Sequence, residues 1–260
     1  MKVVVTGGSG YFGSLLLGKL LGSGHECINI DLNPINIKTR NLTTIRCDIR
    51  DFNKLNKVIG CADVIFHNVA QVPLAKNAHV FDTVNRIGTE NILKAAVNNH
   101  VPNFVYTSSS AIYGVPSQNP VFEGDMPSPK EAYGLAKLQG EETCQKFHQK
   151  YGINVSIIRP RTIMGPGRLG IFSILFDWIE RGYNVPVFNG GNNVYQFVHS
   201  DDLADATILA SAKSGFNAYN IGTEKYGTMR EVLSSLCAYA QTGSKVVSLP
   251  MSPIVSAMKI

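Results

Sequence analysis

The 260-residue chain has few of the features that mark secreted, metal-binding or membrane proteins. Its five cysteines are far apart, odd in number and never spaced as CxxC, which argues against a disulfide framework and against a zinc site. No apolar run reaches the roughly 18 residues that a membrane-spanning helix needs. The first residues, MKVVVTGGSG, read directly as a strand and leave no room for a signal peptide. We therefore expect a cytoplasmic protein with reduced thiols, without a metal site and without a membrane anchor.

Charge of one sign is nowhere concentrated in a block. The net charge of +5 comes from 24 Lys and Arg and 19 Asp and Glu scattered along the chain. The sequence has no arginine-rich arm and no basic stripe interleaved with aromatic residues, so a nucleic-acid partner is not expected. A hydrophobic content of 44% with 17% charged residues predicts a sizeable core, in one large domain or in a main domain with a smaller appendage.

Strand-like and helical segments alternate through the first 160 residues. The expected strands, chosen by their β-branched content, are residues 2–7, 26–31, 43–48, 63–68, 103–110 and 153–160. The expected helices are residues 11–24, 52–59, 79–99 and 128–152, the last with a capping box of Ser128 and Glu131. Because parallel strands need a crossover connection, this alternation predicts an α/β fold with a doubly wound, Rossmann-like parallel sheet. Ligands of such folds bind beyond the carboxyl ends of the strands.

The pattern becomes less regular after Pro160. The expected helices there are residues 171–182, 201–213 and 228–240, and the expected strands are residues 194–200 and 218–222. These elements are too few and too mixed for a second nucleotide-binding domain. We therefore expect residues 1–160 to form a dinucleotide-binding domain, and residues 161–260 to form a small substrate lobe that is partly interleaved with the core.

A glycine-rich segment, VVVTGGSGYFG, joins the first strand to the first helix. Gly8, Gly10 and Gly13 form the pattern G-x-G-x-x-G, whereas Thr6 with Gly7, Gly10 and Gly13 forms T-G-x-x-G-x-x-G. Backbone amides at a helix amino terminus bind anions, and glycines let a pyrophosphate come close to them. In the context of strand, loop and helix, the segment predicts a dinucleotide site.

Two aspartates at strand ends bear on which dinucleotide is bound. Asp31 closes the second strand, 18 residues after Gly13, where a carboxylate accepts hydrogen bonds from the adenosine ribose and would repel a 2′-phosphate. NAD is therefore favoured, although Lys38 and Arg40 nearby leave NADP open. Asp48, at the end of the third strand, could bind the adenine amino group or cap the following helix.

Tyr133 and Lys137 lie four residues apart on an expected helix, so both side chains lie on one face. A tyrosine hydroxyl ordinarily has a pKa near 10, too high for a base at neutral pH. A neighbouring ammonium would stabilise the phenolate, which could then take a proton from an alcohol while a nicotinamide takes the hydride. The pair therefore predicts reversible alcohol oxidation.

Five motifs in the same order resemble the extended short-chain dehydrogenase/reductases, the NAD-dependent epimerase/dehydratase group that acts largely on nucleotide sugars. The motifs are Thr6 to Gly13, YTSSSAIYG (106–114), Tyr133 with Lys137, RPRTIMGPG (159–167) and FVHSDDLA (197–204). The resemblance implies that Ser109, Tyr133 and Lys137 are catalytic, and that Ser109, Ser110, Arg161 and Thr162 bind the substrate. It implies that NAD is bound by Gly7, Gly10, Tyr11, Phe12, Gly13, Asp31, Asp48, Ile49, Val69, Ala70, Asn85, Ser108, Tyr133, Lys137 and Pro160. It also implies a homodimer that pairs through the helices near residues 78–99 and 129–151.

The chain departs from the family pattern at the position that would distinguish a dehydratase. Family dehydratases carry an Asp–Glu pair after the active-site hydroxyl, where this chain has Ser110 and Ala111, which supply neither acid nor base. We therefore expect an epimerase that works through a transient keto intermediate. The alternatives are a net NAD(P)-dependent dehydrogenase or reductase, or a dehydratase, acting on a sugar nucleotide or other alcohol, and, without catalysis, a nucleotide-sensing binding protein of the same fold.

Two further departures concern the substrate lobe. Many family members carry a diphosphate-binding arginine just before the FVHSDD motif, where this chain has Tyr195 and Gln196; Arg159, Arg161 and Arg168 are candidates to replace it. The sequence is also roughly 50 to 80 residues shorter than the resemblance implies for a full lobe. The sequence is thus either part of a longer chain or has an unusually small lobe.

Overall fold

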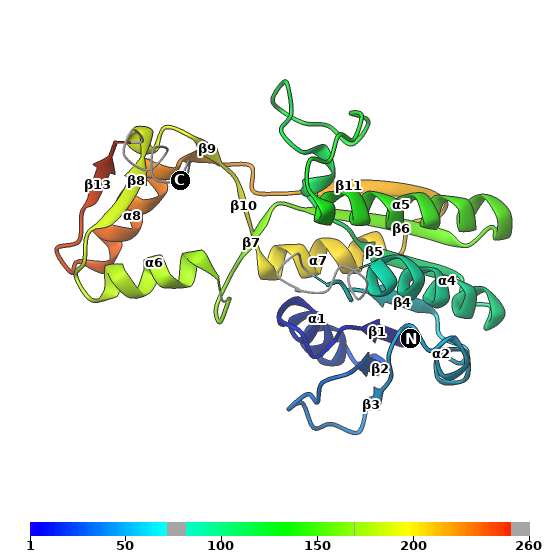
Figure 1. Ribbon diagram of the computed structural model, residues 1–260. Coiled ribbons are helices and arrows are strands. Elements are labelled where there is room, and N and C mark those ends of the chain that lie inside the picture. Colours follow the sequence, from blue (N-terminus) through cyan, green and yellow to red (C-terminus); the bar gives the residue numbers. More distant parts are fainter. Residues whose placement is uncertain (72–81, 169, 251–260) are drawn as a thin grey trace. The chain divides into compact units, whose positions relative to one another are not determined.

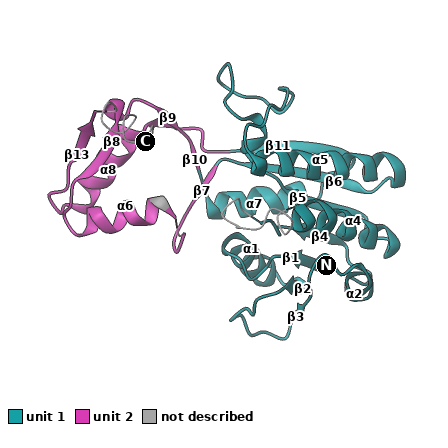
Figure 2. Ribbon diagram, in the orientation of Figure 1, with its two compact units in different colours: residues 1–161, 198–221 teal, residues 162–197, 222–260 magenta. Residues whose placement is uncertain are grey.

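The computed structural model describes residues 1–71, 82–168 and 170–250. The chain forms two compact units (Figure 2). Unit 1 contains residues 1–161 and 198–221, and unit 2 contains residues 162–197 and 222–260. Residues 198–221, which the sequence pattern assigns to the C-terminal lobe, are thus part of unit 1.

Unit 1 is built on a seven-stranded sheet in which every pair of neighbouring strands is parallel, with the order β11-β6-β5-β4-β1-β2-β3 (Figure 1). The strands are β1 (Lys2–Thr6), β2 (Glu26–Asp31), β3 (Leu42–Arg46), β4 (Val64–His67), β5 (Asn103–Thr107), β6 (Asn154–Pro160) and β11 (Phe216–Ile221). The prediction of a doubly wound parallel sheet is confirmed. The strand order reverses at β1, which places a ligand crevice outside the carboxyl ends of β1 and β4.

Helices cover both faces of this sheet (Figure 1). One group is α1 (Tyr11–Gly22) with α7 (Ser200–Ala210), and the other is α2 (Phe52–Val58), α4 (Thr89–Asn98) and α5 (Ala132–Tyr151). A π-helical turn, η1 (Thr83–Gly88), leads directly into α4. Residues 79–81 of the helix expected over 79–99 lie outside the described residues.

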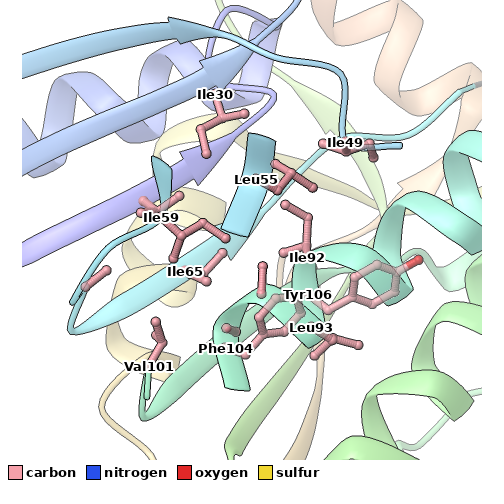
Figure 3. Packing of buried hydrophobic residues seen from close by; sticks show 14 of the residues in the cluster. Ile30, Ile49, Leu55, Ile59, Ile65, Ile92, Leu93, Val101, Phe104 and Tyr106 are labelled. Atoms are coloured by element: carbon pink, nitrogen blue, oxygen red, sulfur yellow. The ribbon is translucent and has the colours of Figure 1, made fainter. Parts of the chain in front are cut away.

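The main core lies between the sheet and the helices α2 and α4 (Figure 3). Strand residues Ile65 and Phe104 meet helix residues Leu55, Ile92 and Leu93, and all five side chains are buried. Val3, Val4 and Val5 of β1 are likewise completely buried on both faces of the sheet, as expected for a central parallel strand. This packing fixes the strand ends that carry the predicted site residues.

Unit 2 has its own small core, formed by Ile179, Val185, Val187, Leu233 and Cys237. Its elements are β7 (Thr162–Met164), α6 (Ile171–Glu180), β8 (Val185–Phe188), η3 (Asn189–Gly191), β9 (Val194–Tyr195), β12 (Gly227–Thr228), α8 (Met229–Ala240) and β13 (Val246–Leu249). The single strand expected over 194–200 is instead β9 and β10 (Phe197–His199), separated by Gln196. Gln196 donates its side-chain amide to the Thr223 carbonyl, 2.7 Å away.

The predicted capping box at Ser128 and Glu131 is wrong. Helix α5 begins at Ala132, and Glu131 is its extended N-cap residue without a side-chain cap bond. Ser128 precedes Pro129, which disfavours the helical conformation at Ser128, and its N–H is bound to the Ile112 carbonyl. The segment before α5 is therefore anchored to η2 (Ser110–Tyr113), the 3₁₀ turn that follows β5.

Candidate active site

The glycine-rich segment forms a cradle at the carboxyl end of β1. Gly7 adopts a φ of 73°, and Gly10 donates its N–H to the Gly7 carbonyl at 3.1 Å. A Cβ on Gly13 would overlap the Gly7 carbonyl oxygen, so position 13 requires glycine. Helix α1 starts at Tyr11 with Gly10 as N-cap and has no side chain capping it, which leaves its first amides available to an anion.

A cleft of about 270 Å³ extends from this cradle along the ends of β2 and β4. The predicted cofactor residues on its wall are Gly7, Gly10, Asp31, Asp48, Ile49, Val69 and Ala70. Asp31 is held at the end of β2, because Oδ2 accepts the Ser9 N–H at 3.0 Å and Oδ1 accepts the Asn33 N–H at 2.9 Å. Its carboxylate thus lies where the sequence places the adenosine ribose.

Asp48 faces the same cleft as part of an ion pair. Its carboxylate accepts three hydrogen bonds from the Arg50 guanidinium, which together with the Arg50 backbone N–H hold the pKa of Asp48 below its usual value. The capping alternative for Asp48 is wrong, because Asp51 caps α2 by accepting the Lys54 N–H at 3.0 Å. Contact of Asp48 with adenine stays a prediction.

The described wall of the cleft contains a buried donor that is not satisfied by the protein. Asn68 accepts the Thr107 hydroxyl at 2.6 Å through Oδ1, but its buried Nδ2 has no partner among the described residues. Buried amides are normally satisfied, so this donor could serve an acceptor oxygen of a ligand. An anion cradle, a carboxylate at the ribose position and this donor together fit a dinucleotide.

Several predicted cofactor residues are buried and are not among the residues that line this cleft. Asn85 is buried, and its side-chain amide makes two hydrogen bonds to the backbone of Gln71. Oδ1 accepts the Gln71 N–H at 2.9 Å, and Nδ2 donates to the Gln71 carbonyl at 3.2 Å. It therefore holds the loop after β4 that carries Val69 and Ala70. Phe12 is buried in the first turn of α1, and Pro160 is buried at the end of β6.

Tyr133 and Lys137 lie on the first two turns of α5, as the YxxxK spacing predicts. Lys137 is 3% exposed, and its Nζ donates to the Thr107 carbonyl at 2.6 Å. The same Nζ lies 5.9 Å from the centroid of the Tyr133 ring and 5.0 Å from that of Tyr106. Burial lowers the pKa of Lys137 to about 8, while the Glu141 carboxylate acts in the opposite direction.

Gly134 brings α5 close to the serine segment. A Cβ at this position would overlap the Ala111 carbonyl oxygen, so glycine is required where α5 crosses η2. Because Tyr133 precedes Gly134 and Ser110 precedes Ala111, this contact brings the Tyr–Lys pair next to the serines. Sequence reasoning did not identify Gly134, although a glycine between two predicted catalytic residues was visible.

The three serines have three different partners. Ser108 is buried and donates its hydroxyl to Glu141 Oε1, and its contact with the cofactor stays a prediction. Ser109 is the N-cap of η2, and its Oγ accepts the Ala111 N–H at 3.1 Å. Ser110 accepts a hydrogen bond from the Arg161 guanidinium at 3.0 Å.

A buried ion pair lies beneath the serines. Arg159 Nη2 is 2.7 Å from Glu141 Oε2, and both side chains are less than a tenth exposed. Arg159 also donates through Nη1 to the Tyr113 hydroxyl at 2.7 Å, and that hydroxyl donates to Asn220 Oδ1 at 2.9 Å. Arg159 is therefore not a replacement for the diphosphate-binding arginine. Sequence reasoning missed Glu141, which lies one helical turn after Lys137.

His67 is a neutral core residue at the end of β4. Its Nδ1 lies 2.7 Å from the Thr6 hydroxyl and its Nε2 lies 3.0 Å from the Thr89 hydroxyl. Burial, with the nearby Lys137 charge, lowers the pKa of His67 to about 3. The side chain is therefore uncharged near neutral pH and links β1, β4 and α4 beneath the cleft.

The predicted substrate residue Thr162 lies in unit 2, where its hydroxyl is 3.0 Å from the Tyr195 hydroxyl. Tyr195 packs with Phe172 and Phe197 in an aromatic cluster. Within residues 1–71, 82–168 and 170–250, no group of three His, Cys, Asp or Glu side chains could hold a metal ion. The helices described there are all too short or too polar to cross a membrane.

Residues 3–222 match the sequence profile of the NAD dependent epimerase/dehydratase family. A protein of Sinorhizobium fredii named uncharacterized protein y4nG is 50% identical over 257 residues, which are 99% of this chain and 65% of that protein. A putative UDP-glucose 4-epimerase of Methanocaldococcus jannaschii is 32% identical over 247 residues, which are 88% of this chain and 79% of that protein. The chain thus spans less than two thirds of the length of y4nG.

Solved structures show the same fold. The crystal structure of UDP-glucose 4-epimerase with UDP-glucose from Thermotoga maritima has a TM-score of 0.84 and 28% identity, covering 96% of this chain and 86% of that one. MoeE5 in complex with UDP-glucuronic acid and NAD has a TM-score of 0.83 and 28% identity, covering 95% of this chain and 86% of that one.

Proposed function

The chain belongs to the NAD dependent epimerase/dehydratase family of enzymes, whose cofactor is NAD, and we propose that it is an epimerase acting on a nucleotide sugar. The observation that carries the proposal is the placement of Tyr133 and the buried Lys137 beside Ser109 and Ser110 at the carboxyl end of the sheet. Relatives and structural neighbours that are named UDP-glucose 4-epimerases support the substrate class.

In the proposed mechanism, Tyr133 is the base that takes the proton from a hydroxyl of the sugar. Lys137 lies one helical turn after Tyr133, and its bond to the Thr107 carbonyl fixes the ammonium. This positive charge stabilises the Tyr133 phenolate. The Ser109 hydroxyl orients the reacting oxygen. Bound NAD supplies the hydride acceptor and donor. The keto sugar then presents its other face, and Tyr133 returns the proton to the oxygen.

The surroundings of Ser110 support epimerisation over dehydration. Removal of water needs an acid and a base next to the active-site hydroxyl. Here Ser110 is hydrogen-bonded to Arg161, and Ala111 contributes only its backbone to the turn. Neither side chain can exchange a proton near neutral pH, so the oxidised sugar keeps its hydroxyl groups.

Net dehydrogenation is the second candidate function, and Gln196 is the observation that favours it. This residue occupies the place where many nucleotide-sugar enzymes carry a diphosphate-binding arginine, and its amide is bound to the Thr223 carbonyl of unit 2. A dehydrogenase would accumulate NADH in proportion to substrate. An epimerase would convert the sugar without net NADH formation, so absorbance and product analysis in one reaction distinguish the two.

The decisive test of the mechanism is Tyr133→Phe. General acid–base groups typically contribute about 10²- to 10⁴-fold to turnover, so we expect kcat to fall by that factor while NAD binding is retained. Tyr151→Phe is the matched control, because Tyr151 ends the same helix and is 47% exposed. Unchanged turnover in Tyr133→Phe would contradict the mechanism. Retention of all cellular function by a Tyr133→Phe, Lys137→Ala double variant would revive the nucleotide-sensing role.

Assembly and location remain part of the proposal. The resemblance implies a homodimer in which α4 and α5 of each copy pair, and the scattered cysteines favour a place in the cytoplasm. The molecular mass in solution at micromolar concentration, measured by light scattering, tests the dimer directly.

A further inference from the structure

Two serine–arginine pairs follow one another at the ends of β5 and β6. Ser108 and Ser110 are two residues apart, as are Arg159 and Arg161; Ser108 follows β5, and Ser110 begins the turn η2. We call Ser108, Arg159 and Glu141 the inner layer, because all three are buried and Glu141 accepts from both partners. We call Ser110 and Arg161 the outer layer, because both are half-buried and lie beyond the last residues of β5 and β6.

The outer layer repeats the inner layer without its carboxylate. Arg161 Nη1 donates to Ser110 Oγ at 3.0 Å. Within the described part of the chain, the arginines with a carboxylate inside 4.0 Å are Arg50, Arg86, Arg159 and Arg181, and Arg161 is not among them. The helix α5 cannot supply the missing group either, because the residue one turn before Glu141 is Lys137.

The hydrogen-bond donors of the outer layer match the missing group. The Ser110 oxygen accepts from Arg161, so its own proton is available for donation to a ligand oxygen. A guanidinium has five N–H donors in a planar fork that fits a carboxylate, and one of them is used on Ser110. A carboxylate placed here could accept hydrogen bonds from both Ser110 and Arg161, as Glu141 does from Ser108 and Arg159.

The order of the strands separates the outer layer from the pyrophosphate cradle. Strand β6 is three positions from β1 in the sheet, which at about 4.8 Å per strand gives roughly 14 Å between their ends. An anion bound at Arg161 would therefore not be the cofactor pyrophosphate. Ser109, the proposed contact of the reacting hydroxyl, is adjacent to Ser110, so the anion belongs close to the carbon that is oxidised.

We propose that Ser110 and Arg161 form a subsite for a carboxylate on the sugar, and that the preferred substrate is a nucleotide-linked uronic acid. This inference rests on the proposed function, which places the sugar at Ser109. It adds that the ring carries a negative charge beside the reacting carbon, and that Arg161 distinguishes sugar acids from neutral sugars.

The test compares UDP-glucuronic acid with UDP-glucose, which carry the same diphosphate and differ in the carboxylate. Dissociation constants are measured by titration calorimetry with saturating NAD for the wild type, Arg161→Gln, Arg161→Lys and Ser110→Ala. We expect the wild type to bind UDP-glucuronic acid at least about 10-fold more tightly than UDP-glucose. Arg161→Gln should weaken binding of the acid by roughly 10- to 100-fold and binding of UDP-glucose by less than about 3-fold. Arg161→Lys should keep part of the preference for the acid over UDP-glucose. Ser110→Ala should weaken binding of the acid by roughly 3- to 10-fold and leave binding of UDP-glucose unchanged.

Lys94→Gln is the matched control for net charge, because Lys94 pairs with Glu90 on the exposed surface of α4. It should leave both dissociation constants unchanged. A wild type without preference for the acid overturns the subsite, and so does Arg161→Gln with unchanged affinities. An equal loss for both sugars in Arg161→Gln assigns Arg161 to the diphosphate and likewise overturns it.

Turnover distinguishes failure of the subsite from failure of the proposed function. Isomerisation of each sugar is followed by nuclear magnetic resonance in the same preparations. Turnover of UDP-glucose without preference for the acid would contradict only the carboxylate subsite. A binding preference that depends on Arg161, without isomerisation of either sugar, would contradict only the epimerase.

Discussion

The inner and outer layers contain the same two residue types two positions apart, yet their surroundings differ. In the inner layer, both Glu141 oxygens accept hydrogen bonds from Arg159, and Ser108 donates to one of them. In the outer layer, Arg161 meets only the Ser110 hydroxyl among the hydrogen bonds found for its side chain in the described residues. Arg159 is structural because it pairs with a protein carboxylate. Arg161 has no carboxylate partner among the described residues, and its guanidinium is therefore available for recognition.

The inner layer is also joined to the rest of unit 1. Arg159 donates to the Tyr113 hydroxyl at 2.7 Å and to the Glu123 carbonyl at 2.9 Å. Asn220 of β11 accepts a hydrogen bond from the Tyr113 hydroxyl through Oδ1 and donates one from Nδ2 to the Val121 carbonyl. A fully satisfied buried network of this kind fixes one arrangement of α5, β6 and the loop after η2.

The largest expected effect comes from Glu141→Gln. Removing one partner of a buried ion pair leaves an uncompensated charge and typically costs about 3–5 kcal/mol of unfolding free energy. Denaturant titration should show this loss. Glu142→Gln is the control, because Glu142 is the next residue of α5 and is exposed. Equal unfolding free energies for the two variants would remove the structural role that the comparison gives to the inner layer.

Ser108→Ala should have the next largest effect. The substitution removes the hydroxyl that donates to Glu141 Oε1 in a buried site. Loss of a hydrogen bond to a buried charged group destabilises by about 1–3 kcal/mol. The same titration measures it, with Ser117→Ala in the exposed loop as control. A cost no larger than that of Ser117→Ala would show that the bond to Glu141 adds nothing.

The pH dependence of turnover tests the link between the inner layer and Lys137. Burial lowers the pKa of Lys137 to about 8, and Glu141, one turn along α5, raises it. A lysine is charged below its pKa, so the ammonium that the mechanism needs is present below about pH 8 and is lost above it. We expect kcat to fall by about tenfold per pH unit above that value.

Lys137→Arg provides the control for this pH profile. A guanidinium stays charged throughout the accessible range, so the residual activity of the variant should show no fall near pH 8. A fall that persists in Lys137→Arg would assign the titration to another group. Arg161→Gln, in the outer layer, should leave the wild-type profile in place.

The parts of the structure that follow from local sequence were predictable. The β-branched runs gave the strands β1 to β6 to within a few residues, because buried parallel strands need such residues. The cradle from Gly7 to Gly13 and the pair of Tyr133 and Lys137 were likewise visible, since each depends on spacing within one segment. Membership of β11 in the main sheet was not, because the chain passes through unit 2 before it returns to pair with β6.

Side-chain partners that are distant in sequence were the other part that could not be predicted. The sequence does not indicate that Ser108 donates to Glu141, which is 33 residues further along the chain. Nor does it indicate that Asn85 binds the backbone of Gln71, 14 residues earlier in the chain. No periodicity or spacing within one segment indicates such a pairing. Only the fold brings these residues together.

The smallest expected effect on stability comes from the outer layer. Arg161→Gln and Ser110→Ala remove groups that are half-buried, and Arg161 has no ion pair among the described residues. Substitutions at such positions usually change the unfolding free energy by less than about 0.5 kcal/mol. Denaturant titration of both variants, beside Glu141→Gln and Ser108→Ala, completes the comparison. If Arg161→Gln cost as much as Glu141→Gln, the outer layer would be a second structural network. If Arg161→Gln instead lost little unfolding free energy but lost affinity for a sugar acid, Arg161 would serve recognition, whereas Arg159, two residues earlier at the end of β6, would serve folding.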